Sequence, residues 1–181
     1  MKRFFTLIGL ISTLFIITSL LDKSASNTSF TPNKNAIAMA KKIVKVSVIP
    51  NFNFSYDFMN LGVLQHLDRH YTYDVIPEQL INGLLFQGIH EVPKGTVIKF
   101  NLLTPATVYF IGCAGADGGF SSILEKLPNW SRSSAFPQYD IYNGKHGLLM
   151  NMYRYDADIG LHSIPASTEN GACFNMVFSK H

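Results

Sequence analysis

The sequence predicts an all-β protein: a single antiparallel, jelly-roll-like β-sandwich domain behind an N-terminal signal segment. Residues 98–102 (Ile-Lys-Phe-Asn-Leu) alternate apolar and polar side chains, the period of a strand with one buried face. After a turn at Thr104-Pro105, residues 106–111 are β-branched or aromatic and uncharged, as expected of a central strand covered on both faces. Further short apolar segments, separated by Gly, Pro and Asn, are typical of a sandwich.

The N-terminus has the features of a secretion signal. Lys2 and Arg3 precede residues 4–21, which carry no charge, and small residues follow at 24–26. We therefore expect residues 1–26 to be a signal peptide and the protein to be secreted or extracellular, with no membrane span after cleavage. The apolar run is also just long enough to cross a bilayer as a helix, so a membrane anchor through residues 4–21 is the alternative.

The remaining chain is predicted to hold one domain. Residues 27–41 show no stable hydrophobic periodicity and are expected to be a flexible lead-in. Residues 42–181 are then the β-sandwich domain, long enough to bury a core that ten of the fourteen Phe and all eight Tyr would fill. The formal charge of +3 comes mostly from residues 2, 3, 22 and 23, with three positive charges and one negative charge. Nucleic acid is therefore not an expected partner.

The other elements are predicted in chain order. Residues 77–80 begin with Pro and predict a short helical turn. Residues 61–70 fit either helical turns or a strand. Residues 112–122 are predicted to be a loop whose glycines adopt positive φ, and they lack the ending of a phosphate-binding loop. Strands are predicted at 43–49, 71–76, 84–89, 139–142, 148–155, 161–165 and 172–178.

Cysteine and asparagine positions suggest two modifications. Cys113 and Cys173 are the two cysteines, and an even count in a secreted chain predicts a disulfide between them. The alternative is a pair of small buried hydrophobic residues. Asn53 and Asn129 begin Asn-x-Ser sequences and are predicted glycosylation sites if they are exposed.

The sequence predicts no catalytic residues. The chain has no Gly-x-Ser-x-Gly sequence, and a nucleophilic role for Cys113 is less favoured than a disulfide.

No cofactor and no metal site is predicted either. His66 and His70 have the spacing of two ligands on one helix face, but the helix length and glutamate of a metalloprotease site are lacking, so surface histidines are expected. Asp117, Asp156 and Asp158 could ligate calcium, although they also suit turns.

Sugar recognition is the chemistry that the remaining residues favour. An aromatic ring stacks on the C–H face of a pyranose, and planar polar groups bond its hydroxyls. Trp130 and Arg132, in a predicted polar loop over 128–137, offer a stacking face and a forked donor. Tyr142 and Arg69 complete the candidate ligand-binding residues. The alternative is that Trp130 closes the end of the sandwich.

A series of short motifs resembles a known family. In order they are Asp68-Arg69-His70-Tyr71, Pro77-Glu78-Gln79-Leu80, Gly95-Thr96-Val97-Ile98-Lys99-Phe100, Pro105-Ala106-Thr107-Val108-Tyr109, Pro128-Asn129-Trp130 and Tyr139-Asp140-Ile141-Tyr142. Over residues 60–178 the chain resembles the small galactose-binding-like β-sandwich modules of carbohydrate-active enzymes. The resemblance implies their fold and, by analogy, contact with carbohydrate. The glycine-rich loop and the two cysteines are not features of that family.

Together these observations predict a secreted, non-catalytic recognition or adhesion module that binds glycans or a glycoprotein on a cell surface. One alternative is a subunit of a cell-surface complex that binds another secreted protein. A second is a small carbohydrate-active enzyme with an unrecognised site. A groove lined by aromatic residues would favour a sugar, and a flat exposed patch would favour a protein partner.

Overall fold

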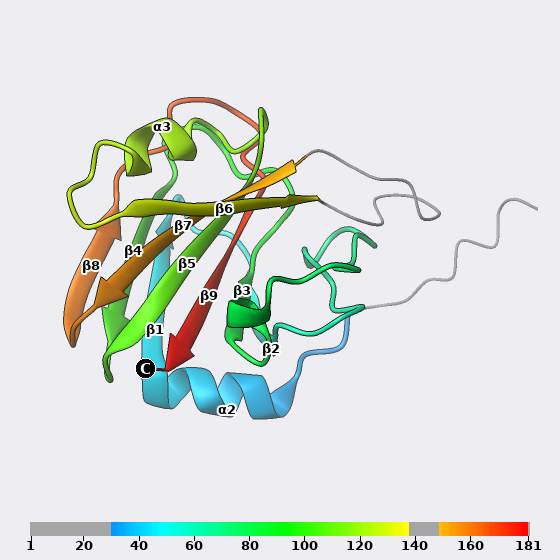
Figure 1. The fold of residues 1–181 in the computed structure, drawn as a ribbon. Coiled ribbons are helices and arrows are strands. Elements are labelled where there is room, and N and C mark those ends of the chain that lie inside the picture. The colour runs from blue at the N-terminus through cyan, green and yellow to red at the C-terminus, as the bar shows by residue number, and fades with distance from the viewer. Residues whose placement is uncertain (1–29, 138–148, 181) are drawn as a thin grey trace, which may run out of the picture.

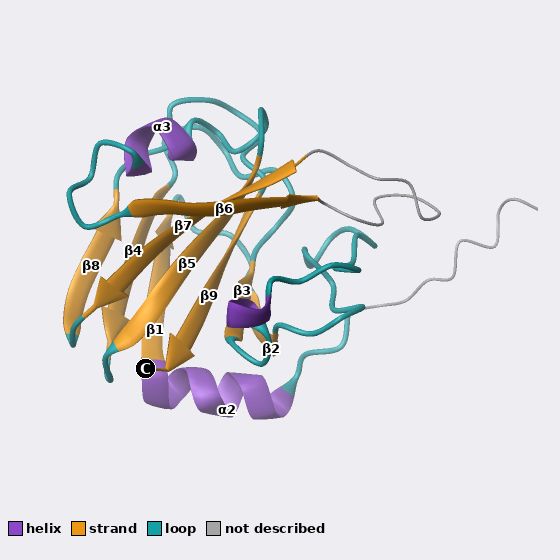
Figure 2. Cartoon of the chain, viewed as in Figure 1, coloured by secondary structure: helices purple, strands orange, loops and turns teal. Residues whose placement is uncertain are grey.

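The computed structural model describes residues 30–137 and 149–180, which form a sandwich of two antiparallel sheets (Figures 1 and 2). The predicted all-β sandwich is therefore confirmed. One sheet has the order β1 (Val44–Ile49), β4 (Val97–Leu102), β8 (Gly160–Ile164). The other has the order β2 (Ser55–Phe58), β3 (Leu84–Gln87), β9 (Phe174–Lys180), β5 (Ala106–Cys113), β7 (Leu149–Ala157), β6 (Ser131–Pro137).

The main core lies between the two sheets. Ile98, Phe100 and Leu102 point inward from β4, and Val108 and Phe110 point inward from β5. The side chains between them on β4 are exposed at residue 99 and half-buried at residue 101. The predicted register of β4 is therefore confirmed, and the turn at 103–105 carries the chain from one sheet to the other.

A second core covers the outer face of the larger sheet. Residues 59–83, which we call the covering segment, contain the η1 turn (Glu78–Leu80). They pack against the outward side chains of β3, β5 and β9. All eight residues of β5 are buried as a result, which confirms the predicted central strand. The buried members of this layer include Met59, Tyr73, Leu80, Leu85, Tyr109, Ile111 and Val177.

Two helices contribute to the main core near opposite ends of the sandwich (Figure 1). The end at which β9 finishes is covered by α2 (Lys34–Ile43), and α3 (Phe120–Leu124) lies near the other end. The predicted flexible lead-in over residues 27–41 is therefore wrong from Lys34 onward. The buried positions 36, 40 and 43 recur at helical spacing, and they give α2 an apolar stripe against the core.

The N-terminus of α2 provides a first test of this correction. The side-chain oxygen of Asn33 accepts hydrogen bonds from the backbone N–H of Asn35 and Ala36, and its amide donates to Asp57 on β2 at 2.6 Å. Replacing Asn33 by alanine removes the cap and should lower the free energy of unfolding by about 1 kcal/mol. Chemical denaturation would measure this, with the exposed neighbour Asn35→Ala as the control. An unchanged midpoint for Asn33→Ala would mean that the cap is not formed.

The other predicted elements differ less. The strands predicted at 43–49, 84–89, 148–155, 161–165 and 172–178 correspond to β1, β3, β7, β8 and β9, and the turn at 77–80 is η1. Residues 71–76 are not a strand; they form one isolated bridge, Leu64 with Thr72. Residues 139–142 and 1–26 lie outside the described residues. Within 30–137 and 149–180, no helix is long and apolar enough to cross a membrane.

Candidate functional site

Trp130 lies immediately before β6 and is largely buried. Its side chain is 9% exposed and belongs to the core between the sheets, 5.4 Å from the ring of Tyr155. This placement supports the alternative in which Trp130 closes the end of the sandwich, because little of its ring is free to stack on a ligand. One side of the residue still borders a surface hollow.

The other predicted binding residues are not gathered around Trp130. Arg132 belongs to β6 rather than to a loop, so the predicted loop over 128–137 is wrong from residue 131. Its guanidinium donates to Asn151 at 2.8 Å. Arg69 pairs with Asp68 in the segment that covers the outer face of the larger sheet. Tyr142 lies outside the described residues.

Two surface hollows flank Tyr155, and we call them together the Tyr155 hollow. One of about 260 Å³ is formed by strands β6 and β7, and one of about 180 Å³ lies toward β8. Both are bordered by Asn129 and Tyr155. The first is completed by Ser131, Arg154 and Asp156, and the second by Phe100, Leu127, Pro128, Trp130, His162 and Ser163.

The aromatic part of the Tyr155 hollow is held in place by neighbouring rings. The hydroxyl of Tyr155 lies 3.1 Å from Nδ1 of His162, whose Nε2 lies 2.8 Å from the carbonyl oxygen of Asp158. The His162 ring also stacks on Phe100, with centroids 5.2 Å apart. Tyr155 is therefore held in a fixed orientation at the border of the hollow. Its side chain is half-buried and packs against the ring of Trp130.

The polar part of the hollow is an ion pair on β7. Arg154 and Asp156 approach to 2.8 Å, and the hydroxyl of Thr107 donates to the same carboxylate at 2.7 Å. Both charged side chains are about half exposed, at 48% and 50%. Asn129 is exposed beside them, so an N-glycan attached there would occupy the hollow itself. Asn53 is also exposed, and glycosylation at both positions stays a prediction.

A larger hollow of about 350 Å³ lies between α2, the η1 turn and the end of β9. Its lining includes Met39, Ile43 and Ile81, with Lys180 as the charged side chain. The half-buried Phe58 and the amides of Gln79 and Asn82 also line it, but its lining residues include no carboxylate to pair with Lys180. The Tyr155 hollow is therefore the better candidate for a polar, ring-shaped ligand.

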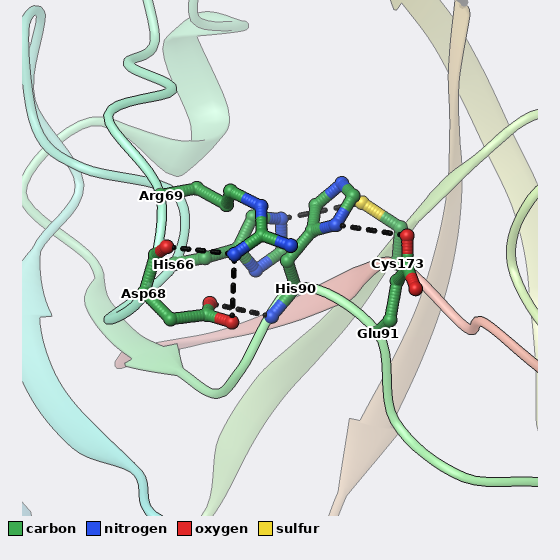
Figure 3. A network of polar contacts seen from close by, with 6 residues as sticks. All are labelled: His66, Asp68, Arg69, His90, Glu91 and Cys173. Carbon is green, nitrogen blue, oxygen red and sulfur yellow. Dashed lines mark hydrogen bonds and ion pairs between the residues drawn. The ribbon is translucent and has the colours of Figure 1, made fainter.

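A separate cluster joins three segments that are distant in the sequence (Figure 3). His66 comes from the covering segment, His90 from the connection after β3, and Cys173 from the residue before β9. His66 Nε2 lies 3.2 Å from Cys173 Sγ, and the two imidazole rings are 5.1 Å apart at 81°. The ring of Tyr71 packs edge-on against both histidines.

Buried hydrogen bonds fix the covering segment and with it His66. The Tyr73 hydroxyl donates to Asn175 on β9 at 2.6 Å, and the Asn175 amide donates to the carbonyl of Gln65 at 2.6 Å. The amide of Gln87 on β3 donates to the carbonyl of Leu64. These bonds satisfy polar groups that would otherwise be buried without partners, and they hold residues 64 and 65 against the sheet.

The connection that carries His90 is fixed in the same way. Asp68 accepts a hydrogen bond from the backbone N–H of His90 at 2.8 Å and pairs with Arg69 at 3.2 Å. The carboxylate of Glu91 lies 3.5 Å from Nδ1 of His90. Arg69 thus belongs to the border of the histidine cluster, whereas the sequence had suggested a role in ligand binding near Trp130.

The environment keeps the cluster uncharged. Burial lowers the pKa of His66 to about 3, and His90 and Arg69 add to the shift. Burial and Arg69 also lower the pKa of His90, against the opposing effects of Glu91 and Asp68. The hydrogen bond with Cys113, together with burial, raises the pKa of Cys173. That hydrogen bond lowers the pKa of the Cys113 thiol.

These pKa directions argue against nucleophilic catalysis by Cys173. A catalytic cysteine is activated as a thiolate beside a base that accepts its proton. Here the imidazole resists protonation and the thiol resists ionisation, and both side chains are almost fully buried. Neutral imidazoles and thiolates are, however, the donors that transition metals bind, and a bound cation deprotonates a coordinating thiol.

The two cysteines lie side by side without a disulfide. Cys113 donates its backbone N–H to the carbonyl of Cys173 at 3.0 Å, so the residues face each other across β5 and β9. Both are free thiols, and the predicted disulfide is therefore corrected. The sequence predicted that they would be neighbours, but it could not show that Cys173 also meets a histidine.

The other metal-ligating candidates have structural partners or lie elsewhere. Asp117 accepts hydrogen bonds from the backbone of Gly119 and Ser121, which fixes the start of α3. Asp156 is held by Arg154 and Thr107. The group of donors around His66 contains His90 and Cys173 rather than His70, because residues 61–70 form turns and not the helix that the spacing required.

The glycine-rich loop is shorter than the predicted 112–122, because β5 runs to Cys113 and α3 begins at Phe120, but glycines within it adopt positive φ as predicted. Glycines 115, 118 and 119 adopt φ values of 79°, 67° and 80°. A Cβ atom at residue 118 would collide with Ala172, and one at residue 119 would collide with Thr168. These close contacts let the loop pack against the residues that precede Cys173.

The described residues thus define a class of protein: an antiparallel β-sandwich with a polar, aromatic hollow at one edge and a buried histidine–cysteine cluster. Among solved structures, the chain is similar to a β-glucuronidase from glycoside hydrolase family 2, with a TM-score of 0.54 at 15% sequence identity. The similarity covers 75% of this chain and 14% of the enzyme's chain, and it shows the fold. No protein-family model and no curated protein sequence matches the chain.

Proposed function

We propose that this protein is a secreted, non-catalytic recognition module that binds glycans, or a glycoprotein on a cell surface, through the Tyr155 hollow. The observation that carries the proposal is the gathering of a half-buried tyrosine, an exposed ion pair and, where Asn129 carries no glycan, an exposed amide around two adjoining hollows. A pyranose ring needs this combination, because it has an apolar C–H face and hydroxyls that both donate and accept.

The fold adds support of a general kind. A similar fold occurs as a part of a β-glucuronidase, so a sandwich of this type is found within a carbohydrate-active protein. The signal segment predicted in residues 1–26 is the reason to expect the module outside the cell, where surface glycans are found. Both points concern the class of ligand, and the particular sugar depends on the hollow itself.

The hollow favours a sugar over the alternative of a protein partner. The aromatic residues around it line a concave surface, and large exposed hydrophobic residues elsewhere in the described chain are aliphatic. Among the described residues that border the hollow, Asp156 is the carboxylate, and its pairing with Arg154 suits it to bind rather than to donate a proton.

Screening the purified protein on an array of plant, microbial and animal glycans would identify a ligand, and calorimetry would give its affinity. Arg154→Ala should then weaken binding about 10-fold to 100-fold, since it removes a charge-assisted hydrogen bond. Its melting temperature should stay close to that of the wild type, because an exposed ion pair contributes little to stability.

Arg132→Ala is the matched control, since Arg132 is exposed on the neighbouring strand and borders neither part of the hollow. Binding should be unchanged in this variant. Loss of binding in Arg132→Ala with normal binding in Arg154→Ala would mean that the glycan binds at β6 near Arg132 and not in the Tyr155 hollow. No binding to any glycan on the array would overturn the proposed function.

A further inference from the structure

We propose that His66, His90 and Cys173 are the ligands of a transition-metal ion of the zinc class. Each side chain offers one donor atom, and the three atoms lie within 4.8 Å of one another (Figure 3). In a tetrahedral zinc site, metal–nitrogen and metal–sulfur bonds of about 2.0 and 2.3 Å place the donors about 3.5 Å apart. His66 Nε2 and Cys173 Sγ are already 3.2 Å apart. Small side-chain rotations therefore bring all three donors onto one ion.

The donor set selects the kind of metal. Two imidazoles and one thiolate are borderline to soft ligands, which suit zinc, whereas calcium and magnesium require oxygen ligands. The oxygen atoms near the cluster belong to Asp68 and Glu91, and each has a partner of its own. Three protein ligands leave one position of a tetrahedral ion for a further donor.

The surroundings of His90 match the support that metal-binding histidines have. The Glu91 carboxylate lies 3.5 Å from Nδ1, which makes no hydrogen bond to the described residues; coordination through Nε2 would place the ring proton on Nδ1, facing this carboxylate. Asp68 holds the backbone N–H of the same residue. A carboxylate behind a ligating histidine both orients the ring and increases its basicity.

His66 gives an independent reason to expect a ligand. Its side chain is fully buried, yet its Nδ1 has no hydrogen-bond partner among the described residues. The ring is left with a single polar contact, to the weakly bonding sulfur of Cys173. A metal–nitrogen bond at Nε2 would replace this weak contact with a strong one, and Nδ1 would then carry the ring proton.

The ion would fasten three parts of the chain to one another. It joins the covering segment, the connection after β3 and the residue before β9. The ligands His66 and Cys173 are 107 residues apart in the sequence. This side of the sandwich is distant from the Tyr155 hollow, because the covering segment and the residues between α3 and β6 lie on opposite sides in Figure 1. The site is therefore separate from the proposed glycan-binding site.

Cobalt(II) is the probe that tests the ligand set directly. The full-length protein, reduced and freed of metal with a chelator that is then removed, is titrated with Co²⁺ under anaerobic conditions. We expect one equivalent to produce the intense visible bands of a tetrahedral ion and a thiolate-to-metal band, and Zn²⁺ to abolish both. Zn²⁺ should also raise the melting temperature of the wild-type protein by several degrees.

Variants separate this site from adventitious binding. His90→Ala should weaken Co²⁺ binding at least 100-fold, and Cys173→Ser should remove the thiolate band. His70→Ala, which changes an exposed histidine nearby, and Cys113→Ala, which retains the three ligands, should bind as the wild type does. Circular dichroism of each metal-free variant shows whether it is folded. If His90→Ala is folded and still binds cobalt with the wild-type spectrum, the site is wrong. A weak octahedral spectrum, or a Cys113–Cys173 disulfide in the isolated protein, would also overturn it.

Discussion

Replacing Phe100 by alanine is expected to lower the free energy of unfolding by about 3–5 kcal/mol, through lost burial and the cavity that remains. Phe100 is fully buried on β4. Its ring contacts Phe178 of the opposite sheet, with centroids 5.9 Å apart, and stacks on His162 of β8. The side chain thus connects both sheets. Urea denaturation would show the loss as a lower midpoint with an unchanged slope.

Lys99→Ala is the control for this substitution. Lys99 is the next residue on the same strand, and its side chain is exposed. The change should alter stability by no more than about 0.5 kcal/mol. Comparable losses in the two variants would mean that the register of β4 is wrong, since adjacent residues on a strand point to opposite faces.

Acidification is expected to destabilise the metal-free protein through His66. The pKa of this ring is about 3 in the folded state and 6.5 in the unfolded state. Above pH 6.5 both states hold the ring neutral, so stability does not depend on it. As the pH falls below 6.5, the His66 ring becomes protonated in the unfolded state but stays neutral in the folded state. One pH unit then costs about 1.4 kcal/mol, and the loss reaches about 3 kcal/mol at pH 4.

Denaturation curves at pH 7 and pH 4, with a chelator and a reductant present, would measure this loss. Other groups also titrate over this range, so the wild type is compared with His66→Gln, whose side chain cannot be protonated. The variant should lose about 3 kcal/mol less than the wild type between the two pH values. His70→Gln should behave as the wild type, because His70 is exposed. Equal losses in the wild type and His66→Gln would show that the ring is not buried as neutral imidazole.

The local sequence pattern was sufficient to predict the strands of the main core. It was insufficient to predict the helix α2 and the covering segment that pack against them. The alternation over 98–102 predicted β4 and its register, since a strand with one wet face repeats every two residues. The helix α2 was missed because its buried stripe is made of two alanines and one isoleucine, and the apolar residues 37–39 obscure the helical period. Residues 71–76 have the composition of a strand, yet Tyr73 is drawn to the outer face of the sheet by Asn175.

The candidate sites show the same division. Trp130 and the Arg154–Asp156 pair come from neighbouring strands, and the sequence indicated that sugar-binding residue types were present in this region. It assigned the forked donor to Arg132, whereas β6 and β7 bring Arg154 to the hollow. Which arginine borders the hollow depends on how β6 and β7 pair and on the face of the sheet to which each side chain points. The residue pattern of a short edge strand predicts neither the pairing nor the face.

The sequence by itself determined the β-sandwich and its central strand, because these follow from residue periodicity. The even cysteine count predicted that Cys113 and Cys173 are neighbours, although the bond it implied between them is not formed. Only the tertiary structure decided that His66 meets His90 and Cys173 rather than His70. Spacing along the chain reports proximity only within a regular element, and residues 61–70 form turns. Their path is set instead by buried hydrogen bonds to β3 and β9, formed with residues far away in the sequence.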